Sequence, residues 1–197
     1  QQGARWLTVL LGPATVALLA AAYVRGLIEG GMLATLKHFP GHGDTEVDSH
    51  LGLPIISHPR ERLESVELIP FRSSIAASVD AVMTAHIQMP ALEPAARTPA
   101  TFSSRIVEHL LRDELGFDGL VFTDSMRMRA ISELMPPGQA AARAVTAGHD
   151  VILHSPDDAL AFRGLKTAVT QGQLTVARLD NSVRRILTAK ARLGLHR

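Results

Sequence analysis

The stretch SSRIVEHLLRDELGFDGLVFTDSM, residues 103–126, decides the fold of this 197-residue chain. Its first part places apolar side chains at the 3.6-residue spacing of a helix, and Gly116 ends that pattern. Its second part, 119–126, is an apolar run with an acid, Asp124, near its end. A helix followed by a fully apolar strand is typical of a parallel sheet covered by helices, so residues 103–126 predict an α/β fold.

The rest of the chain repeats this unit. Further strands are expected at 32–39, 80–87 and 150–155. Helices are expected before, between and after the strands, at 14–31, 59–78, 137–148, 156–172 and 175–194. No G-x-G-x-x-G motif follows a strand, so the pattern favours a (β/α)8 barrel of the TIM type over a nucleotide-binding sheet. About four βα units are half of such a barrel, and we expect one partial barrel domain over residues 1–197.

Composition excludes several classes of function. The chain has 20 Lys and Arg against 19 Asp and Glu, and its aromatic residues are one Trp, one Tyr and six Phe. Neither a basic surface nor a base-stacking platform follows from these numbers, so we expect no nucleic-acid partner. The chain has no Cys, which excludes disulfides, thiolate metal sites and a cysteine nucleophile.

Residues 6–24 carry no charge, and this length is sufficient for a membrane span or a signal-peptide core. Gly12 and Pro13 interrupt the run, and Pro13 suits the first turn of a helix. We therefore expect a buried helix at 14–31, with no membrane span and no signal peptide in this chain. The compartment stays open between the cytoplasm and export.

The segment KHFPGHGDTEVDSH, residues 37–50, concentrates polar chemistry in a short stretch. Its candidate metal ligands are His38, His42, Asp44, Asp48 and His50. Pro40 and two glycines break the interval between the first two histidines, whereas metal ligands are usually held by regular elements. The lysine precedes the glycines, which is the reverse of a phosphate-binding loop. We therefore predict neither a metal nor a cofactor here.

Acid–base chemistry suits the end of this segment better. Asp48 and His50 are two positions apart, so their side chains project to the same side of an extended loop. A carboxylate beside an imidazole orients it and favours its protonated form. His50 is thus a candidate general acid and base with Asp48 as its partner. Pairs of this kind also serve only to hold a loop, and the residues alone leave both interpretations open.

Other polar groups follow the predicted strands. Asp124 places a carboxylate at the end of an apolar run, which suits a nucleophile but also the N-cap of a following helix. Lys37 and His38 end another run, where they can hydrogen-bond substrate hydroxyls. A lysine at such a place can instead form an ion pair with a carboxylate of the barrel, Asp124 included.

These residues resemble glycoside hydrolase family 3, and within it the bacterial β-N-acetylhexosaminidases, or β-N-acetylglucosaminidases. KHFPGHGDTEVDSH, followed by LGLP, carries the resemblance. The segments AVMTAHI, LLRDELGFDGLVFTDSMRM, AARAVTAGHDVIL and LDNSVRRILTAKARLGL continue it in the same order. The similarity extends from about residue 14 to the end of the chain, and GHD at 148–150 stands where the family usually has GAD.

The resemblance implies the carboxyl-terminal half of a TIM-like barrel and a retaining exo-hydrolysis through a covalent glycosyl-enzyme. The implied substrate is terminal β-linked GlcNAc of peptidoglycan or chitin fragments, and no cofactor is implied. By position in the family motifs, Asp124 is the nucleophile, His50 is the acid/base, and Asp48 assists it. Lys37 and His38 correspond to the pair that binds sugar hydroxyls.

Several alternatives stay open at this stage. A family 3 β-glucosidase is one, although the D-S-H motif argues against it. An inactive remnant that acts as a binding or scaffold module is another, and a metal-dependent hydrolase is a third. Phosphate could also replace water as the acceptor. A half-barrel has an open edge, so self-association through that edge is expected.

Overall fold

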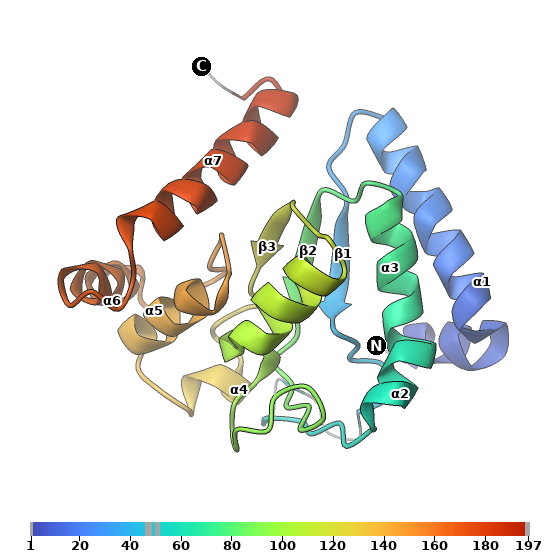
Figure 1. Cartoon of the computed structure of the whole chain (residues 1–197), viewed down its shortest axis with the longest axis horizontal. Coiled ribbons are helices and arrows are strands. Elements are labelled where there is room, and N and C mark those ends of the chain that lie inside the picture. The colour runs from blue at the N-terminus through green and yellow to red at the C-terminus, as the bar shows by residue number, and fades with distance from the viewer. Residues whose placement is uncertain (1, 46–48, 50–51, 196–197) are drawn as a thin grey trace.

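The computed structural model describes residues 2–45, 49 and 52–195, with the side chains of residues 2–11 left aside. Three parallel strands form one sheet in the order β1-β2-β3, namely β1 (Thr35–Phe39), β2 (Ala81–Thr84) and β3 (Leu120–Phe122). Figure 1 shows this sheet at the centre, with helices on both sides of it. The predicted α/β class and parallel pairing are confirmed.

Helices connect the strands. Before β2 come three helical segments that follow one another directly in the sequence. They are α2 (Arg60–Arg62), the π-helical η1 (Leu63–Glu67) and α3 (Leu68–Ala76). The connection from β2 to β3 passes the short 3-10 helix η2 (Ala100–Phe102) and the π-helical η3 (Arg105–Glu114).

The remaining helices follow β3. They are α4 (Arg129–Ser132), α5 (Pro137–Ala147), α6 (Asp158–Thr170) and α7 (Val176–Arg192). The local sequence explains where several of these helices begin. Pro137, for example, occupies the first turn of α5. Asp157 and Thr175 are the N-caps of α6 and α7, and each accepts a backbone N–H three residues ahead.

The fourth predicted strand, 150–155, is reduced to a single parallel bridge between Phe122 and Val151. Val151 N donates to Val121 O at 3.1 Å, and Thr123 N donates to Val151 O at 3.1 Å. Beyond that point Leu153 N donates to the Thr123 side-chain hydroxyl, at 2.9 Å. Regular pairing ends there because a side chain has replaced the backbone acceptor.

The first helix, α1 (Gln2–Glu29), has a kink at Gly12, whose φ of 64° is not helical. The predicted interruption at Gly12 and Pro13 is therefore confirmed. Beyond the kink, Ala17, Ala21 and Val24 are buried, so α1 offers a small-residue face for packing and covers α3 (Figure 1). No helix in the described ranges is both long and apolar enough to cross a membrane.

The main core lies between the sheet and the helices of its two βα connections. It contains Val82 and Val121 from the strands, Phe71 from α3, and Ile106 and Leu110 from η3. The last two belong to the apolar face that the sequence predicts for 103–116. Truncating a buried Leu or Ile to Ala costs about 2–5 kcal/mol, so this cluster is a main source of stability.

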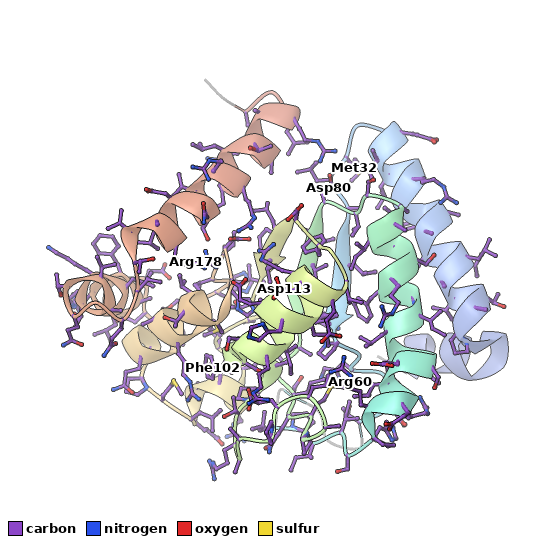
Figure 2. All side chains as sticks on the ribbon, viewed as in Figure 1. Met32, Arg60, Asp80, Phe102, Asp113 and Arg178 are labelled. Atoms are coloured by element: carbon purple, nitrogen blue, oxygen red, sulfur yellow. The ribbon has the colours of Figure 1, made fainter. Side chains whose placement is uncertain are left out.

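The amino ends of the strands are held together by a buried acid. Asp80, just before β2, accepts a hydrogen bond from Ala34 N at 2.8 Å. Its second oxygen pairs with Arg192 at the end of α7. Figure 2 shows Asp80 near Met32, in the loop before β1. Asp80 therefore links the starts of two strands to the last helix.

Candidate active site

Two polar side chains meet at the carboxyl ends of β1 and β3. His38 Nε2 lies 3.5 Å from Asp124 Oδ2, although the two residues are 86 positions apart. Their side chains are 24% and 18% exposed, so both are largely shielded and still reachable from solvent. The sequence predicted both residues at strand ends, and the structure brings them together.

The local backbone of β1 explains why His38 faces Asp124. Pairing with β2 joins Lys37 to Met83 and then Phe39 to Thr84, so β1 carries one extra residue. A bulge of this kind reverses the alternation of side chains. Leu36 and Phe39 both pack against the main core, and the bulge leaves Lys37 and His38 between them to face away from it.

Among the described residues, Asp124 contacts one backbone N–H and one basic side chain. Its Oδ1 accepts a hydrogen bond from the neighbouring Ser125 N at 2.7 Å. The alternative role as a helix N-cap is wrong, because α4 begins only at Arg129, with Met128 as its N-cap and no side-chain capping bond. Within the described residues, His38 is the one basic side chain at ion-pair distance from Asp124.

Lys37 lies beside this pair in sequence but not in contact. Its side chain is exposed at the end of β1. In the described part of the chain it forms no ion pair with Asp124, so the alternative of a structural Lys–Asp pair there is not supported. The side chain is therefore available to a ligand bound above the strand ends.

His38 is neutral at neutral pH. Burial lowers its pKa from 6.5 to about 4, although the nearby Asp124 carboxylate acts in the opposite direction. The contact with Asp124 is therefore that of an imidazole beside a carboxylate, and not a full ion pair. This matters chemically because a neutral imidazole at 3.5 Å places no positive charge beside the Asp124 carboxyl group, whereas a protonated one would.

His86 contacts the backbone immediately after Asp124. Its Nε2–H donates to Ser125 O at 3.0 Å, and its Nδ1 accepts from the Thr101 hydroxyl at 2.6 Å. The side chain is fully buried, and burial lowers its pKa to about 4. His86 therefore holds the backbone next to Asp124. Sequence analysis gave it no role, although its place at the end of a predicted strand was a signal.

The predicted acid/base His50 and its partner Asp48 lie outside the described residues. Ser49, between them in sequence, is described and is 2% exposed. His42 Nε2 lies 2.9 Å from Ser49 Oγ, and the His42 ring stands edge-on to the His38 ring with centroids 5.8 Å apart. His42, in the described part of this loop, therefore contacts both Ser49 and His38, and His38 lies beside Asp124.

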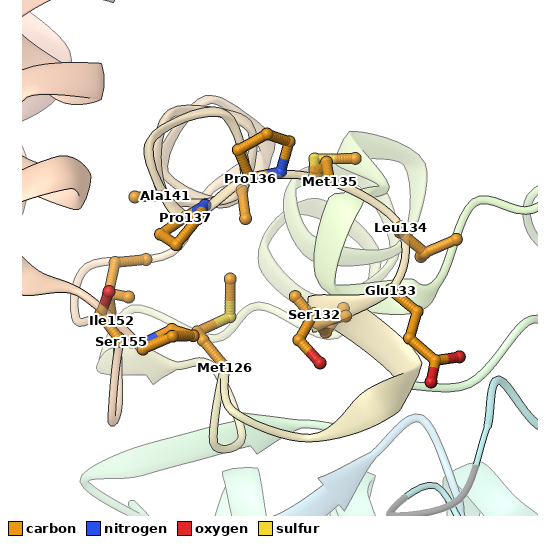
Figure 3. A pocket seen from close by; sticks show the side chains of 13 residues that line it. Met126, Ser132, Glu133, Leu134, Met135, Pro136, Pro137, Ala141, Ile152 and Ser155 are labelled. Carbon is orange, nitrogen blue, oxygen red and sulfur yellow. The ribbon is translucent and has the colours of Figure 1, made fainter.

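A pocket of about 510 Å³ opens nearby, between the segment after Asp124 and the start of α5. Figure 3 shows Met126, Met135, Pro136, Pro137 and Ile152 around it. The thirteen side chains that line it are mostly apolar, and Asp124, Lys37 and His38 are not among them. This pocket neighbours the polar group at the strand ends but is not the same site.

Metal coordination finds no support in the described residues. They contain no group of three or more His, Asp or Glu side chains placed to hold a metal ion. His38 and Asp124 are only two potential ligands, and Asp44 is engaged by His58 at 2.7 Å.

Comparisons with known proteins agree on one family. The sequence model described as "Glycosyl hydrolase family 3 N terminal domain" matches residues 12–189. A "Beta-N-acetylglucosaminidase/beta-glucosidase" of Cellulomonas fimi is 38% identical over 192 residues, covering 93% of this chain and 34% of the relative. A "Beta-hexosaminidase" of Xylella fastidiosa is 43% identical over 141 residues, covering 72% of this chain and 41% of the relative.

A solved structure agrees as well. A glycoside hydrolase family 3 β-N-acetylglucosaminidase from a Paenibacillus species superposes with a TM-score of 0.88 at 49% sequence identity. The match covers 92% of this chain and 35% of that protein. The chain thus spans about a third of the length of that protein and of the Cellulomonas relative.

Proposed function

This chain belongs to glycosyl hydrolase family 3, and on that premise we propose that it is the carboxyl-terminal half of a barrel that hydrolyses terminal β-linked GlcNAc with retention of configuration. Fragments of peptidoglycan or chitin are the proposed substrates. One observation carries the proposal: the carboxyl group of Asp124 lies at the strand ends, 3.5 Å from a neutral histidine, His38, of a distant strand. That is the environment a carboxylate nucleophile needs.

The proposed first step forms a covalent glycosyl-enzyme. One oxygen of Asp124 attacks the anomeric carbon of the sugar, and the bond from that carbon to the leaving oxygen breaks. Protonated His50, oriented by Asp48, gives its proton to the leaving oxygen, so the aglycone departs as a neutral alcohol. Asp124 is then an ester of the sugar, and His50 is neutral.

The second step releases the sugar. Neutral His50 takes a proton from water while the water oxygen attacks the anomeric carbon from the face that the aglycone left. The ester bond to Asp124 breaks, the carboxylate is restored, and His50 is again protonated. Two displacements at one carbon return the original β configuration. A histidine in this role avoids a second carboxylate beside Asp124, which like-charge repulsion would disfavour.

Lys37 and His38 are proposed to bind the sugar while Asp124 reacts. The bulge in β1 turns both side chains away from the core, so they can reach hydroxyls of a sugar above the strand ends. The His38 imidazole can donate one hydrogen bond without adding charge, because burial keeps it neutral. Lys37 can donate from its exposed ammonium.

Covalent trapping tests the proposal most directly. The longest natural polypeptide that contains this chain is incubated with a fluorinated GlcNAc derivative with a good leaving group, which forms the ester but hydrolyses it slowly. Peptide mass spectrometry should then find one added sugar on the peptide that contains Asp124. Asp118→Asn is a matched control, because this acid lies just before β3, at the opposite end of the strand, and its side chain is exposed.

Several other results would contradict the proposal or favour an alternative. Labelling of a different carboxylate, or none despite turnover of an aryl β-GlcNAc, would remove Asp124 as nucleophile. Turnover of an aryl β-glucoside alone would instead support the β-glucosidase alternative. Complete inactivity of the longest natural form would support a binding or scaffold role, and a sugar phosphate formed in phosphate buffer would identify phosphate as the acceptor.

A further inference from the structure

His86 is a polar side chain enclosed by the core at the carboxyl end of β2. It is fully buried. A buried imidazole lowers stability unless its nitrogen atoms find hydrogen-bond partners, and His86 has one partner for each nitrogen. The partners come from other parts of the chain, Thr101 in η2 and Ser125 after β3. His86 therefore joins the end of β2 to the turn that carries Asp124.

These partners assign one tautomer to His86. Ser125 O is a carbonyl oxygen and can only accept, so Nε2 carries the proton of the hydrogen bond between them, at 3.0 Å. Burial lowers the pKa of His86 to about 4, so the ring is neutral at neutral pH and Nδ1 is an acceptor. The Thr101 hydroxyl therefore donates to Nδ1, at 2.6 Å, and not to Ala85 O, which lies farther away at 3.2 Å. Thr101 thus fixes the direction in which the Nε2–H points.

Ser125, the residue that His86 holds, is also a partner of Asp124. Its N–H donates to Asp124 Oδ1 at 2.7 Å, while its carbonyl oxygen accepts from His86. The other oxygen of Asp124, Oδ2, lies 3.5 Å from His38 Nε2. The orientation of Ser125 therefore decides which oxygen of Asp124 faces His38.

The line of contacts from Thr101 to Asp124 gives His86 a role beyond packing. We propose that His86 is a positioning residue for the nucleophile: by holding Ser125 it keeps Oδ1 of Asp124 on the Ser125 N–H and presents Oδ2 to the anomeric carbon. Without this anchor the turn can rotate and carry Oδ2 away, and a misplacement of about 1 Å can cost about 100-fold in rate. The inference rests on the proposed function, and it adds a residue that acts only through Ser125.

The test measures the attack by Asp124 itself, in the longest natural polypeptide that contains this chain. His86→Leu keeps a side chain of moderate size and removes both hydrogen bonds. The rate constant for labelling of Asp124 by the fluorinated GlcNAc derivative should fall about 10- to 100-fold, because the carboxyl group is misdirected, and kcat/KM on an aryl β-GlcNAc should fall with it. The inhibition constant of GlcNAc, which reports sugar binding without attack, should change less than about threefold.

Two milder variants separate the hydrogen bond from the fold. His86→Gln can place an amide N–H near the position of Nε2 and should recover much of the labelling rate. Thr101→Val removes only the hydroxyl that orients the ring, and it should slow labelling about 3- to 10-fold. Thr101→Val also carries the test if His86→Leu does not fold.

His149→Leu is the matched control for the loss of a buried histidine. Like His86, His149 is fully buried, donates to a backbone oxygen, Ala144 O, and accepts from a threonine hydroxyl, that of Thr84. Neither of these partners belongs to the turn after β3. His149→Leu should therefore lower the Tm about as much as His86→Leu does, and it should change the labelling rate less than about twofold.

Three outcomes would overturn the inference. A wild-type labelling rate in His86→Leu, or in Thr101→Val where the former does not fold, would show that Asp124 needs no such anchor. An equal loss of rate in His149→Leu would indicate that lost stability alone slows the attack. His86→Gln as slow as His86→Leu, at the wild-type Tm, would exclude the Nε2–H as the anchor. Labelling of Asp124 in the wild-type protein supports the proposed function whatever these variants do, whereas no labelling there would overturn both proposals.

Discussion

Two carboxylates, one at each end of β3, have opposite environments. At the amino end, Asp150 is fully buried and accepts hydrogen bonds from Val121 N at 3.0 Å, Arg112 Nη2 at 2.9 Å and Ser182 Oγ at 2.6 Å. Arg178 and Arg185 add cations at 3.6 and 3.3 Å. At the carboxyl end, the partners of Asp124 among the described residues are the backbone N–H of its neighbour and a neutral histidine.

The two environments suit different roles, stability for Asp150 and the proposed chemistry for Asp124. Every lone pair of Asp150 that faces the interior is engaged, so the carboxylate holds η3, α7 and the sheet together but cannot attack a substrate. Figure 2 shows Arg178 on α7, the helix that supplies two of these three arginines. Within the described residues Asp124 has only these two contacts, and its side chain is 18% exposed, so we expect it to contribute less to stability than Asp150.

The largest expected effect is on activity at the carboxyl end. Asp124→Asn removes the proposed nucleophile while keeping its shape, so kcat on an aryl β-GlcNAc should fall about 10⁴-fold or more. The free energy of unfolding should stay constant or rise by up to about 1 kcal/mol, because a poorly compensated charge is lost. Steady-state kinetics and urea unfolding measure the two quantities. Retained turnover, or a clear loss of stability, would remove the contrast with Asp150.

The next effect is on stability at the amino end. Asp150→Ala leaves three arginines without their shared carboxylate, and removing one partner of a buried ion pair costs about 3–5 kcal/mol. Urea unfolding followed by circular dichroism measures this loss. Asp113→Ala is the matched control, because this side chain is 70% exposed and its one ion pair within the described residues is with His109. Its expected cost is below about 0.5 kcal/mol.

A loss of less than about 1 kcal/mol for Asp150→Ala would contradict this assignment. It would mean that the arginines find water or other acceptors when the carboxylate is gone. Substitution of the acid at the amino end of β3 would then cost as little stability as substitution of Asp124 at the carboxyl end.

A third prediction concerns the histidine before Asp150. His149 donates from Nδ1 to Ala144 O at 3.0 Å and accepts from the Thr84 hydroxyl at 2.8 Å, and burial lowers its pKa to about 3. The unfolded imidazole binds a proton near pH 6.5, so the unfolded state takes up protons first as the pH falls. Stability should therefore decrease from about pH 6.5 towards pH 3.

The measurement is the slope of unfolding free energy against pH. One proton contributes about 1.4 kcal/mol per pH unit, so His149→Ala should reduce the slope by up to that amount between pH 4 and 6. An unchanged slope in the His149 variant would show that the folded protein accepts a proton there.

Sequence patterns predicted the edge of the sheet at which His38 and Asp124 meet. The apolar run before Asp124 and the run before Lys37 and His38 both ended in polar groups, and strand direction places such groups at one edge. The bulge in β1 was not predictable, because nothing in the letters of 35–39 marks an extra residue. The predicted site residues Asp48 and His50 remain predictions, as does self-association through the open edge.

Sequence analysis did not predict the ion pairs of Asp150 at the amino end of β3, and the reason is physical. Asp150 opened a predicted strand, but its partners come from η3 and α7, at 112, 178 and 185. Helical patterns show which face of a helix is polar, and they do not show which distant acid that face meets. His149 was noticed only as a departure from a family motif, whereas the structure shows a buried link between Thr84 and α5.

The smallest expected effect comes from an arginine at the carboxyl end. Arg129 pairs with Glu133 at 3.5 Å, and both side chains are more than 60% exposed. An exposed pair contributes little, so Arg129→Ala should change the free energy of unfolding by less than about 0.5 kcal/mol. Arg112→Ala, at the amino end with a side chain 8% exposed, should cost several-fold more. Similar costs for the two variants would contradict this prediction, because they would show that the burial of an arginine does not determine its contribution to stability.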